Sequence, residues 1–208
     1  MLLVGITGGV ASGKSVVRKM FEELGAEGLD ADEICHRNLD RMREVIREEF
    51  GEEFVDKEGR IDRRRLGRLI FQDEKARKRL ESLLHPFVEK KLQEVKKRYK
   101  DKDVVVVCEI PLLFEVGWED KFDCIIVVIR DEDKRREFLK REMGLTDEEI
   151  EGRFSAQLPL SEKEKKAHWV IDNNGSLEDT RIQVKKIWDR LIKGRIKKEE
   201  SDGRIYYQ

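Results

Sequence analysis

The stretch G-G-V-A-S-G-K-S at residues 8–15 decides the fold of this chain, because it fits the pattern G-x-x-x-x-G-K-[ST]. Glycines in such a loop let backbone N–H groups surround a phosphate without a Cβ in the way. Lys14 brings a positive charge to the β and γ phosphates, and the Ser15 hydroxyl is a ligand for Mg²⁺. The pattern therefore predicts a binding site for a nucleoside triphosphate.

The residues on either side of this loop support the prediction. Residues 1–7, M-L-L-V-G-I-T, are typical of a short buried strand, and residues 15–24 are typical of an amphipathic helix. The apolar side of that helix carries Val17, Met20, Phe21 and Leu24. A tight glycine turn that binds nothing is the alternative. The position between a strand and a helix argues against it, because a helix N-terminus itself attracts anions.

Four more strands are predicted along the chain, at residues 26–29, 104–110, 122–129 and 168–172. Residues 104–110 are almost wholly apolar, as expected of a parallel strand that is covered on both faces. Helical segments separate the strands, and Ser176 with Asp179 forms a capping-box pattern before the last helix. The alternation predicts an α/β fold with a five-stranded parallel sheet and helices on both faces.

Two long helical insertions interrupt the alternation, one after the second strand and one after the fourth. Both leave the carboxyl ends of strands, where α/β proteins place ligands. The sequence thus predicts a discontinuous nucleotide-binding core, a helical acceptor-binding region, a lid and a mobile charged tail. Their expected bounds are 1–32, 100–132 and 167–193 for the core, 33–99 for the acceptor region, 133–166 for the lid and 194–208 for the tail.

The composition excludes several classes of partner. Of 208 residues, 44 are Lys or Arg and 45 are Asp or Glu, so the net charge of −1 provides no attraction to nucleic acid or a membrane surface. No apolar run approaches the roughly 20 residues of a membrane span, and the start of the chain does not resemble a signal peptide. Three cysteines without C-x-x-C spacing favour buried thiols in a cytoplasmic protein. A monomer and a small homo-oligomer are both compatible with the sequence.

Other motifs and the two helical insertions indicate which class of phosphate-binding-loop protein this is. A GTPase needs an N-K-x-D motif, which is absent. D-x-x-G occurs at residues 56–59, in a polar turn, and at 172–175, too late in the chain for a switch. Helical insertions after strands two and four instead match the acceptor and lid regions of small-molecule kinases.

Further motifs narrow this class. They are residues 5–15, D-A-D at 30–32, D-R at 62–63 with Leu66 and I-F at 70–71, L-E at 80–81, H-P at 85–86, I-P-L-L-F-E at 110–115, residues 141–146, A-Q at 156–157 and I-D-N-N-G at 171–175. In this order, over about residues 3–185, the chain closely resembles the dephospho-CoA kinase family. The resemblance implies phosphorylation of the ribose 3′-hydroxyl of dephospho-CoA by ATP with Mg²⁺, which gives CoA and ADP in the final step of coenzyme A synthesis.

The resemblance also implies site residues. Catalysis falls to Asp32, which positions the acceptor hydroxyl and takes its proton, to Lys14, and to Arg141 of the lid. ATP binding falls to Gly9, Val10, Ala11, Ser12, Gly13, Lys14, Ser15, Val16 and Asn173. Metal binding falls to Ser15 and Glu109. Acceptor binding falls to Asp30, Asp32, Arg63, His85, Pro111 and Leu112.

Each of these residues also has a purely structural interpretation. The two aspartates of D-A-D are a helix cap and a solvated charge in that case, or face different ways if the strand continues. Glu109 is then a strand-end charge, and His85-Pro86 is a helix break. Arg63 and Arg141 then only decorate charged helices, and Leu112 is core or pocket wall. Asn173 either forms an Asx-turn or contacts the adenine.

Three positions depart from the family pattern. Glu109 replaces an aspartate, His168 stands where Ala-Asp is usual, and Glu137 stands where an arginine is expected four residues before Arg141. The last departure leaves open which arginine assists Arg141, with Arg135 and Arg136 as the candidates.

Two other functions are compatible with the loop. One is a nucleotide-sensing module that binds ATP without a small acceptor, and the other is a kinase for a nucleoside monophosphate. The Asp32 position and an arginine-bearing lid favour chemistry over sensing, and the D-A-D, H-P and I-P-L-L-F-E set favours dephospho-CoA as the acceptor.

Overall fold

The computed structural model describes residues 1–193, so the predicted tail at 194–208 lies outside the described residues. The chain forms two compact units. Unit 1 contains residues 1–30, 99–145 and those from 157 onward, and unit 2 contains residues 31–98 and 146–156. The division assigns part of the predicted lid to each unit, so the lid as one moving body stays a prediction.

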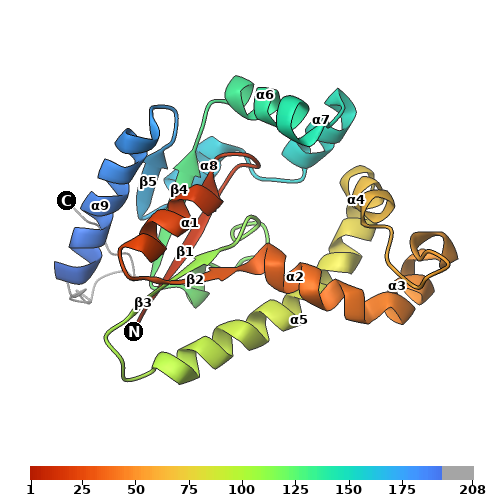
Figure 1. Ribbon diagram of the computed structural model, residues 1–208, viewed down its shortest axis with the longest axis horizontal. Coiled ribbons are helices and arrows are strands. Elements are labelled where there is room, and N and C mark those ends of the chain that lie inside the picture. Colours follow the sequence, from red (N-terminus) through yellow and green to blue (C-terminus); the bar gives the residue numbers. More distant parts are fainter. Residues whose placement is uncertain (194–208) are drawn as a thin grey trace. The chain divides into compact units, whose positions relative to one another are not determined.

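Unit 1 is built on a sheet of five parallel strands (Figure 1). The strand order is β2-β3-β1-β4-β5, so β1 with its phosphate-binding loop lies in the centre. The strands are β1 (Leu2–Gly8), β2 (Glu27–Asp30), β3 (Val105–Glu109), β4 (Cys124–Ile129) and β5 (Trp169–Asp172). The predicted five-stranded parallel α/β fold is confirmed.

One face of the sheet is covered by α1 (Lys14–Glu23) and α9 (Leu177–Lys193), which contact each other. The predicted apolar side of α1 is buried, and Phe21 packs at 6.5 Å from the ring of Trp188 on α9. The core beneath the helices consists of alternate strand residues, because successive side chains of a strand point to opposite faces. They are Val4, Ile6, Val105, Val107, Cys124, Ile126, Val128 and Ile171.

The other face of the central strand carries no side chain at Gly5. A Cβ there would lie 2.6 Å from Leu113 Cδ1 and 3.2 Å from the ring of Phe122. The segment between β3 and β4 therefore packs directly on the backbone of β1. Unit 1 also holds α6 (Glu132–Met143), α8 (Leu160–Lys165) and a short 3-10 helix (Glu119–Lys121).

Unit 2 is helical. It contains α2 (Ala31–Leu39), α3 (Arg43–Phe50), α4 (Arg63–Gln72), α7 (Asp147–Ser155), nearly all of α5 (Glu74–Tyr99), and short 3-10 helices at Asp40–Met42 and Glu52–Phe54. Its own apolar core consists of Leu39, Ile46, Phe54, Ile61, Leu66, Leu80 and Leu84. The polar turn predicted at residues 56–59 is present, and Asp56 Oδ1 accepts the backbone N–H groups of Glu58 and Arg60.

Two local expectations are corrected by the structure. His85-Pro86 does not break a helix, since α5 continues through Pro86. Pro86 and Ser82 are exposed, so water can bond the carbonyl that loses its helical N–H partner. The second strand does not continue past Asp30: α2 starts at Ala31 and places Asp32 in its first turn. The alternating arrangement of the two aspartates along a strand is therefore absent.

The predicted capping box before the last helix is confirmed. Ser176 and Asp179 form the predicted capping box, in which the Ser176 N–H donates to Asp179 Oδ2 and Asp179 N–H donates to Ser176 Oγ. None of the three cysteines forms a disulfide; Cys108 and Cys124 are buried as expected, whereas Cys35 is partly exposed. Burial raises the pKa of Cys124 to about 12. Within residues 1–193, the structure has no helix with the length and apolar character that crossing a bilayer requires.

His168, which departs from the family pattern, fastens the edge of the sheet. Its Nδ1 accepts the backbone N–H of Ile125 at 3.0 Å. The backbone N–H of His168 donates to the Ile125 carbonyl at 2.9 Å. An imidazole nitrogen can accept only while it is unprotonated. Burial lowers the pKa of His168, consistent with this neutral form.

We expect this histidine to make the protein less stable in acid. Because the folded-state pKa is lowered, the unfolded chain binds more protons as the pH falls from about 6.5, the ordinary histidine value. Its stabilising effect is present above that pH and is lost below it. His85, whose pKa burial also lowers, acts in the same direction. Urea denaturation at pH 7.5 and 5.5 should show a smaller pH dependence for His168→Gln than for the wild type. An equal dependence would contradict the assignment.

Candidate active site

The phosphate-binding loop closes around the backbone of Gly9. The ammonium group of Lys14, only 7% exposed, donates to the Gly9 carbonyl at 2.9 Å, and the Ser12 N–H donates to the same carbonyl at 3.2 Å. Ala11 and Gly13 have φ values of 59° and 94°. Both values lie in the left-handed region, which glycine adopts most readily, where the loop turns into α1.

Asn173 braces this loop from the end of β5. Its Nδ2 donates to the Ser12 carbonyl at 2.8 Å, and its Oδ1 accepts the hydroxyl of Thr180 at 2.8 Å. The Asx-turn considered for Asn173 is made instead by Asp172, whose Oδ1 accepts the N–H of Asn174. A contact between Asn173 and the adenine stays a prediction.

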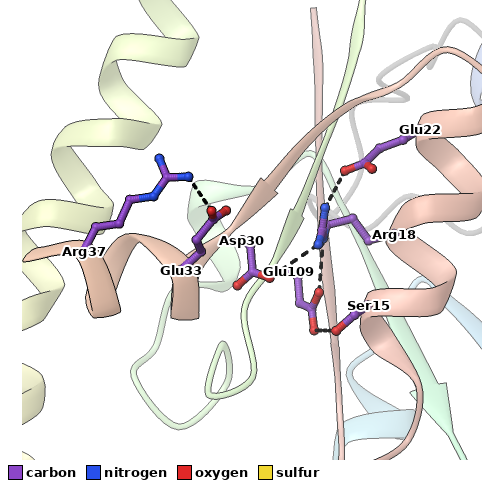
Figure 2. A network of polar contacts seen from close by, with 7 residues as sticks. All are labelled: Ser15, Arg18, Glu22, Asp30, Glu33, Arg37 and Glu109. Carbon is purple, nitrogen blue, oxygen red and sulfur yellow. Dashed lines mark hydrogen bonds and ion pairs between the residues drawn. The ribbon is translucent and has the colours of Figure 1, made fainter. Parts of the chain in front are cut away.

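A carboxylate and a guanidinium meet beside Ser15, the last residue of the loop motif (Figure 2). Glu109, at the end of β3 and only 6% exposed, accepts the Ser15 hydroxyl at 2.8 Å through Oε1 and the Arg18 Nε at 3.1 Å through Oε2. Burial lowers the pKa of Arg18, but its bonds to Glu109 and Glu22 outweigh burial and leave that pKa raised. The strand-end carboxylate is thus paired with Arg18 and in contact with the predicted metal ligand.

Arg18 also reaches the end of β2. Its Nη2 lies 3.4 Å from Asp30 Oδ2, so one guanidinium contacts three carboxylates, those of Glu22, Asp30 and Glu109 (Figure 2). Sequence reasoning missed Arg18. Its position three residues after Ser15 was the available signal, because residues three apart lie on the same side of a helix.

The oxygen donors at the loop suit Mg²⁺. The Ser15 hydroxyl and the Glu109 carboxylate adjoin each other, and oxygen ligands are those that Mg²⁺ prefers. Within residues 1–193, no cluster of three or more His, Cys, Asp or Glu side chains could hold a metal alone. Such a site fits an ion that is held mainly by nucleotide phosphates and water.

Two residues that the sequence did not assign to the loop contact it from outside. Gln157 Oε1 accepts the N–H of Val10 at 2.8 Å. Arg135, 7% exposed, donates from Nε to the Arg130 carbonyl at 3.0 Å, and a Cβ on Gly9 would lie 2.6 Å from its Nη1. Arg135 is therefore the arginine of α6 that lies at the loop.

The other arginines of α6 are placed differently. The side chain of Arg141 is 74% exposed and pairs with Glu137 at 3.6 Å and Glu142 at 3.0 Å. Arg136 pairs with Glu132 at 2.7 Å. The structure therefore does not bring Arg141 to the phosphate-binding loop, and its catalytic role stays a prediction.

Pro111, predicted to bind the acceptor, lies in a buried polar cluster. Its carbonyl accepts the Thr7 hydroxyl at 3.1 Å and the ammonium of Lys163 at 3.1 Å. Lys163 is fully buried and pairs with Glu115 at 2.8 Å. These contacts fix the segment after β3 against β1 and α8. Leu112, next to Pro111, is partly exposed, which fits its prediction as a pocket wall.

The other predicted acceptor residues belong to unit 2. Arg63 pairs with Asp40 at 2.7 Å, and His85 is half-buried on α5. Asp32 is exposed in the first turn of α2, and its charge acts on Arg153 of α7. Burial lowers the pKa of Arg153, while Glu149 and Asp32 oppose that change. An exposed carboxylate with a cation nearby is suited to receive a hydroxyl.

Comparisons with known proteins agree on one family. Residues 2–179 match the family model described as dephospho-CoA kinase. A dephospho-CoA kinase of Geobacillus kaustophilus is 41% identical over 200 residues, which cover 92% of this chain and 99% of that protein. One of Aquifex aeolicus is 38% identical over 197 residues, which cover 93% of this chain and 99% of the relative.

Solved structures give the same picture. A crystal structure from Thermus thermophilus is 38% identical with a TM-score of 0.77, covering 91% of this chain and 97% of that one. A dephospho-CoA kinase from Campylobacter jejuni is 30% identical with a TM-score of 0.67, and the match covers 93% of this chain and 98% of that one. A shikimate kinase from Acinetobacter baumannii, 15% identical with a TM-score of 0.55 over 95% and 96%, shares the fold.

Proposed function

Because this chain belongs to the dephospho-CoA kinase family, we propose that phosphoryl transfer depends on its phosphate-binding loop and on an acceptor carboxylate, Asp32. The enzyme is an ATP-dependent kinase that converts dephospho-CoA to CoA, the final step of coenzyme A biosynthesis. The observation that carries the proposal is the Glu109 carboxylate, which accepts hydrogen bonds from both Ser15 and Arg18 at the end of the phosphate-binding loop.

The proposed roles in unit 1 concern charge and position. The backbone of residues 9–16 holds the β and γ phosphates, and Lys14 neutralises charge on the transferring group. Arg135, which contacts the loop at Gly9 and Val10, adds a second cation close to the phosphates. Preorganised cations of this kind stabilise charge in the transition state without reorganising during the reaction.

Ser15 and Glu109 are the residues that would hold Mg²⁺. The ion would supply positive charge that offsets the negative charge of the nucleotide phosphates. Arg18 shares the Glu109 carboxylate, so it fixes the orientation of that carboxylate toward Ser15. Arg18 is in this proposal a positioning residue for the metal ligand.

Asp32 is the proposed acceptor-side group. A carboxylate is a weak base, so it orients the 3′-hydroxyl and accepts the proton as the loose transition state forms. Asp30, held by Arg18 in unit 1, is assigned a supporting role. We also propose a cytoplasmic setting, because a reducing compartment suits a protein whose cysteines form no disulfide.

The function is tested by mixing purified protein, ATP and Mg²⁺ with a panel of acceptors and measuring ADP and phosphorylated product. Dephospho-CoA should be phosphorylated with a higher kcat/KM than any nucleoside monophosphate. Turnover only with a nucleoside monophosphate would replace the proposed acceptor, and ATP binding without turnover would favour a sensing module.

Arg141→Ala should lower kcat far more than it weakens ATP binding, because the charge that Arg141 is proposed to meet develops in the transition state. Lys140→Ala, which removes an exposed cation from the same helix, is the matched control and should leave kcat unchanged. Arg135→Gln provides the comparison with the arginine already at the loop. If Arg141→Ala weakens ATP binding while kcat is unchanged, Arg141 stabilises bound ATP and the transition state equally, and the proposed catalytic role is wrong.

A further inference from the structure

Unit 2 contains an arginine-rich cavity between α4 and α7, and of its lining residues only Arg63 has been assigned a role so far. Its charged lining comprises Arg63, Arg64, Arg68, Arg153, Glu148 and Glu149. Four arginines against two glutamates leave the lining positive. Arg63 shares its charge with Asp40, and Arg68 lies 3.9 Å from Glu149, so the excess is concentrated toward Arg64 and Arg153.

Arg153 is the most constrained of these cations. Its guanidinium lies over the ring of Phe71 at 4.6 Å from the centroid, which fixes its plane. Its Nε is buried and has no hydrogen-bond partner. A buried donor without an acceptor is unfavourable unless something supplies one. Burial also lowers the pKa of Arg153, because it disfavours the charged guanidinium. A nearby anion would favour the charged form and so offset this cost of burial.

Two glycines shape the cavity. Gly152 packs α7 tightly on α4, since a Cβ there would lie 3.0 Å from the Phe71 carbonyl oxygen. Gly67 lines the cavity, and a Cβ at that position would meet nothing within 4 Å. The helices are thus held together at Gly152 while space remains open above Gly67.

We propose that this cavity binds the diphosphate bridge of the acceptor nucleotide. The proposal deepens the proposed function and rests on it. The bridge of such a nucleotide is a diester with two negative charges, and the arginines of the lining outnumber its glutamates by four to two. Arginine forks bind phosphate oxygens through paired N–H groups, and such charge-assisted bonds are among the strongest available.

The position of Asp32 supports this assignment. Asp32 and Arg153 belong to the same unit and interact electrostatically. In the acceptor, the ribose links its 3′-hydroxyl to its 5′-diphosphate through a few bonds. We therefore expect a ribose whose hydroxyl lies at Asp32 to place its diphosphate near the arginines of the cavity. A single acceptor molecule would then contact both the carboxylate of Asp32 and these arginines.

The test is calorimetric binding of dephospho-CoA while a nonhydrolysable ATP analogue saturates the nucleotide site. Arg153→Gln removes the cation, and Gly67→Leu fills the cavity without changing charge. Leucine is the better helix former, so the second variant keeps the test valid if the first fails to fold. Arg60→Gln, which removes an exposed arginine outside the cavity, is the control.

Arg153→Gln and Gly67→Leu should each raise the Kd of dephospho-CoA on the order of tenfold or more, as expected for loss of a charged hydrogen bond. The Kd of the ATP analogue should not change. Inorganic pyrophosphate, at constant free Mg²⁺, should compete with dephospho-CoA in the wild type. An unchanged Kd in both variants, an equal rise in Arg60→Gln, or no competition by pyrophosphate would overturn the proposal.

A kinetic measurement separates this inference from the proposed function. If the wild type phosphorylates dephospho-CoA and the cavity variants keep its KM, the cavity assignment alone is wrong. If the wild type phosphorylates no dephospho-CoA, the proposed function is wrong, whatever the cavity binds.

Discussion

Lys14→Ala should nearly abolish turnover while the protein stays folded. The ammonium group is 7% exposed and bonds the loop carbonyl of Gly9, so it is held where the phosphates bind rather than in the apolar core. Loss of one transition-state cation removes several kcal/mol of stabilisation, on the order of a hundredfold or more in rate. The rate of ADP formation at saturating ATP and dephospho-CoA measures this effect.

The matched control is Lys19→Ala, which removes an exposed lysine from the same helix. It should leave both kcat and the far-UV circular dichroism spectrum unchanged. If Lys14→Ala retains near-normal kcat with an unchanged spectrum, the phosphate-binding assignment of the loop is wrong.

Asp32→Asn should keep acceptor binding and lose most of kcat. The amide is nearly isosteric with the carboxylate and still orients a hydroxyl, but it cannot take the proton that leaves as the phosphoryl group arrives. Contributions of a general base are typically about 10² to 10⁴ in rate. Single-turnover phosphorylation, with enzyme in excess over dephospho-CoA, measures the chemical step directly.

Asp30→Asn provides the contrast within the same D-A-D motif. Asp30 pairs with Arg18 beside Glu109, so its loss should disturb the metal side of the site and reduce the rate less. A larger loss of single-turnover rate in Asp30→Asn than in Asp32→Asn would reverse the two roles.

Local patterns were sufficient for much of the fold. The phosphate-binding loop, the buried side of α1 and the five parallel strands followed from glycine spacing and apolar periodicity, which depend on neighbouring residues alone. The Ser176 capping box followed in the same way, because its partners are three residues apart. The boundary between β2 and α2 did not follow, since D-A-D is compatible with both a strand end and a helix start.

The partners of charged side chains were beyond local reasoning. The arginines of α6 have similarly charged neighbours in the sequence. Only the packing of the helix places Arg135 at the loop and Arg141 in solvent. Gln157 bonds Val10 across 147 residues, and Asn173 bonds Ser12 across 161. No spacing rule predicts such pairs, because they depend on how distant segments meet.

The sequence by itself determined the phosphate-binding loop, the parallel sheet and the family, since these depend on short motifs and on which side chains avoid water. Only the tertiary structure decided that Arg18 pairs with Glu109 and that the Arg153 guanidinium lies over the ring of Phe71. The physical reason is that burial of apolar residues follows a period along the chain, whereas the environment of a charge depends on all the groups that folding brings around it.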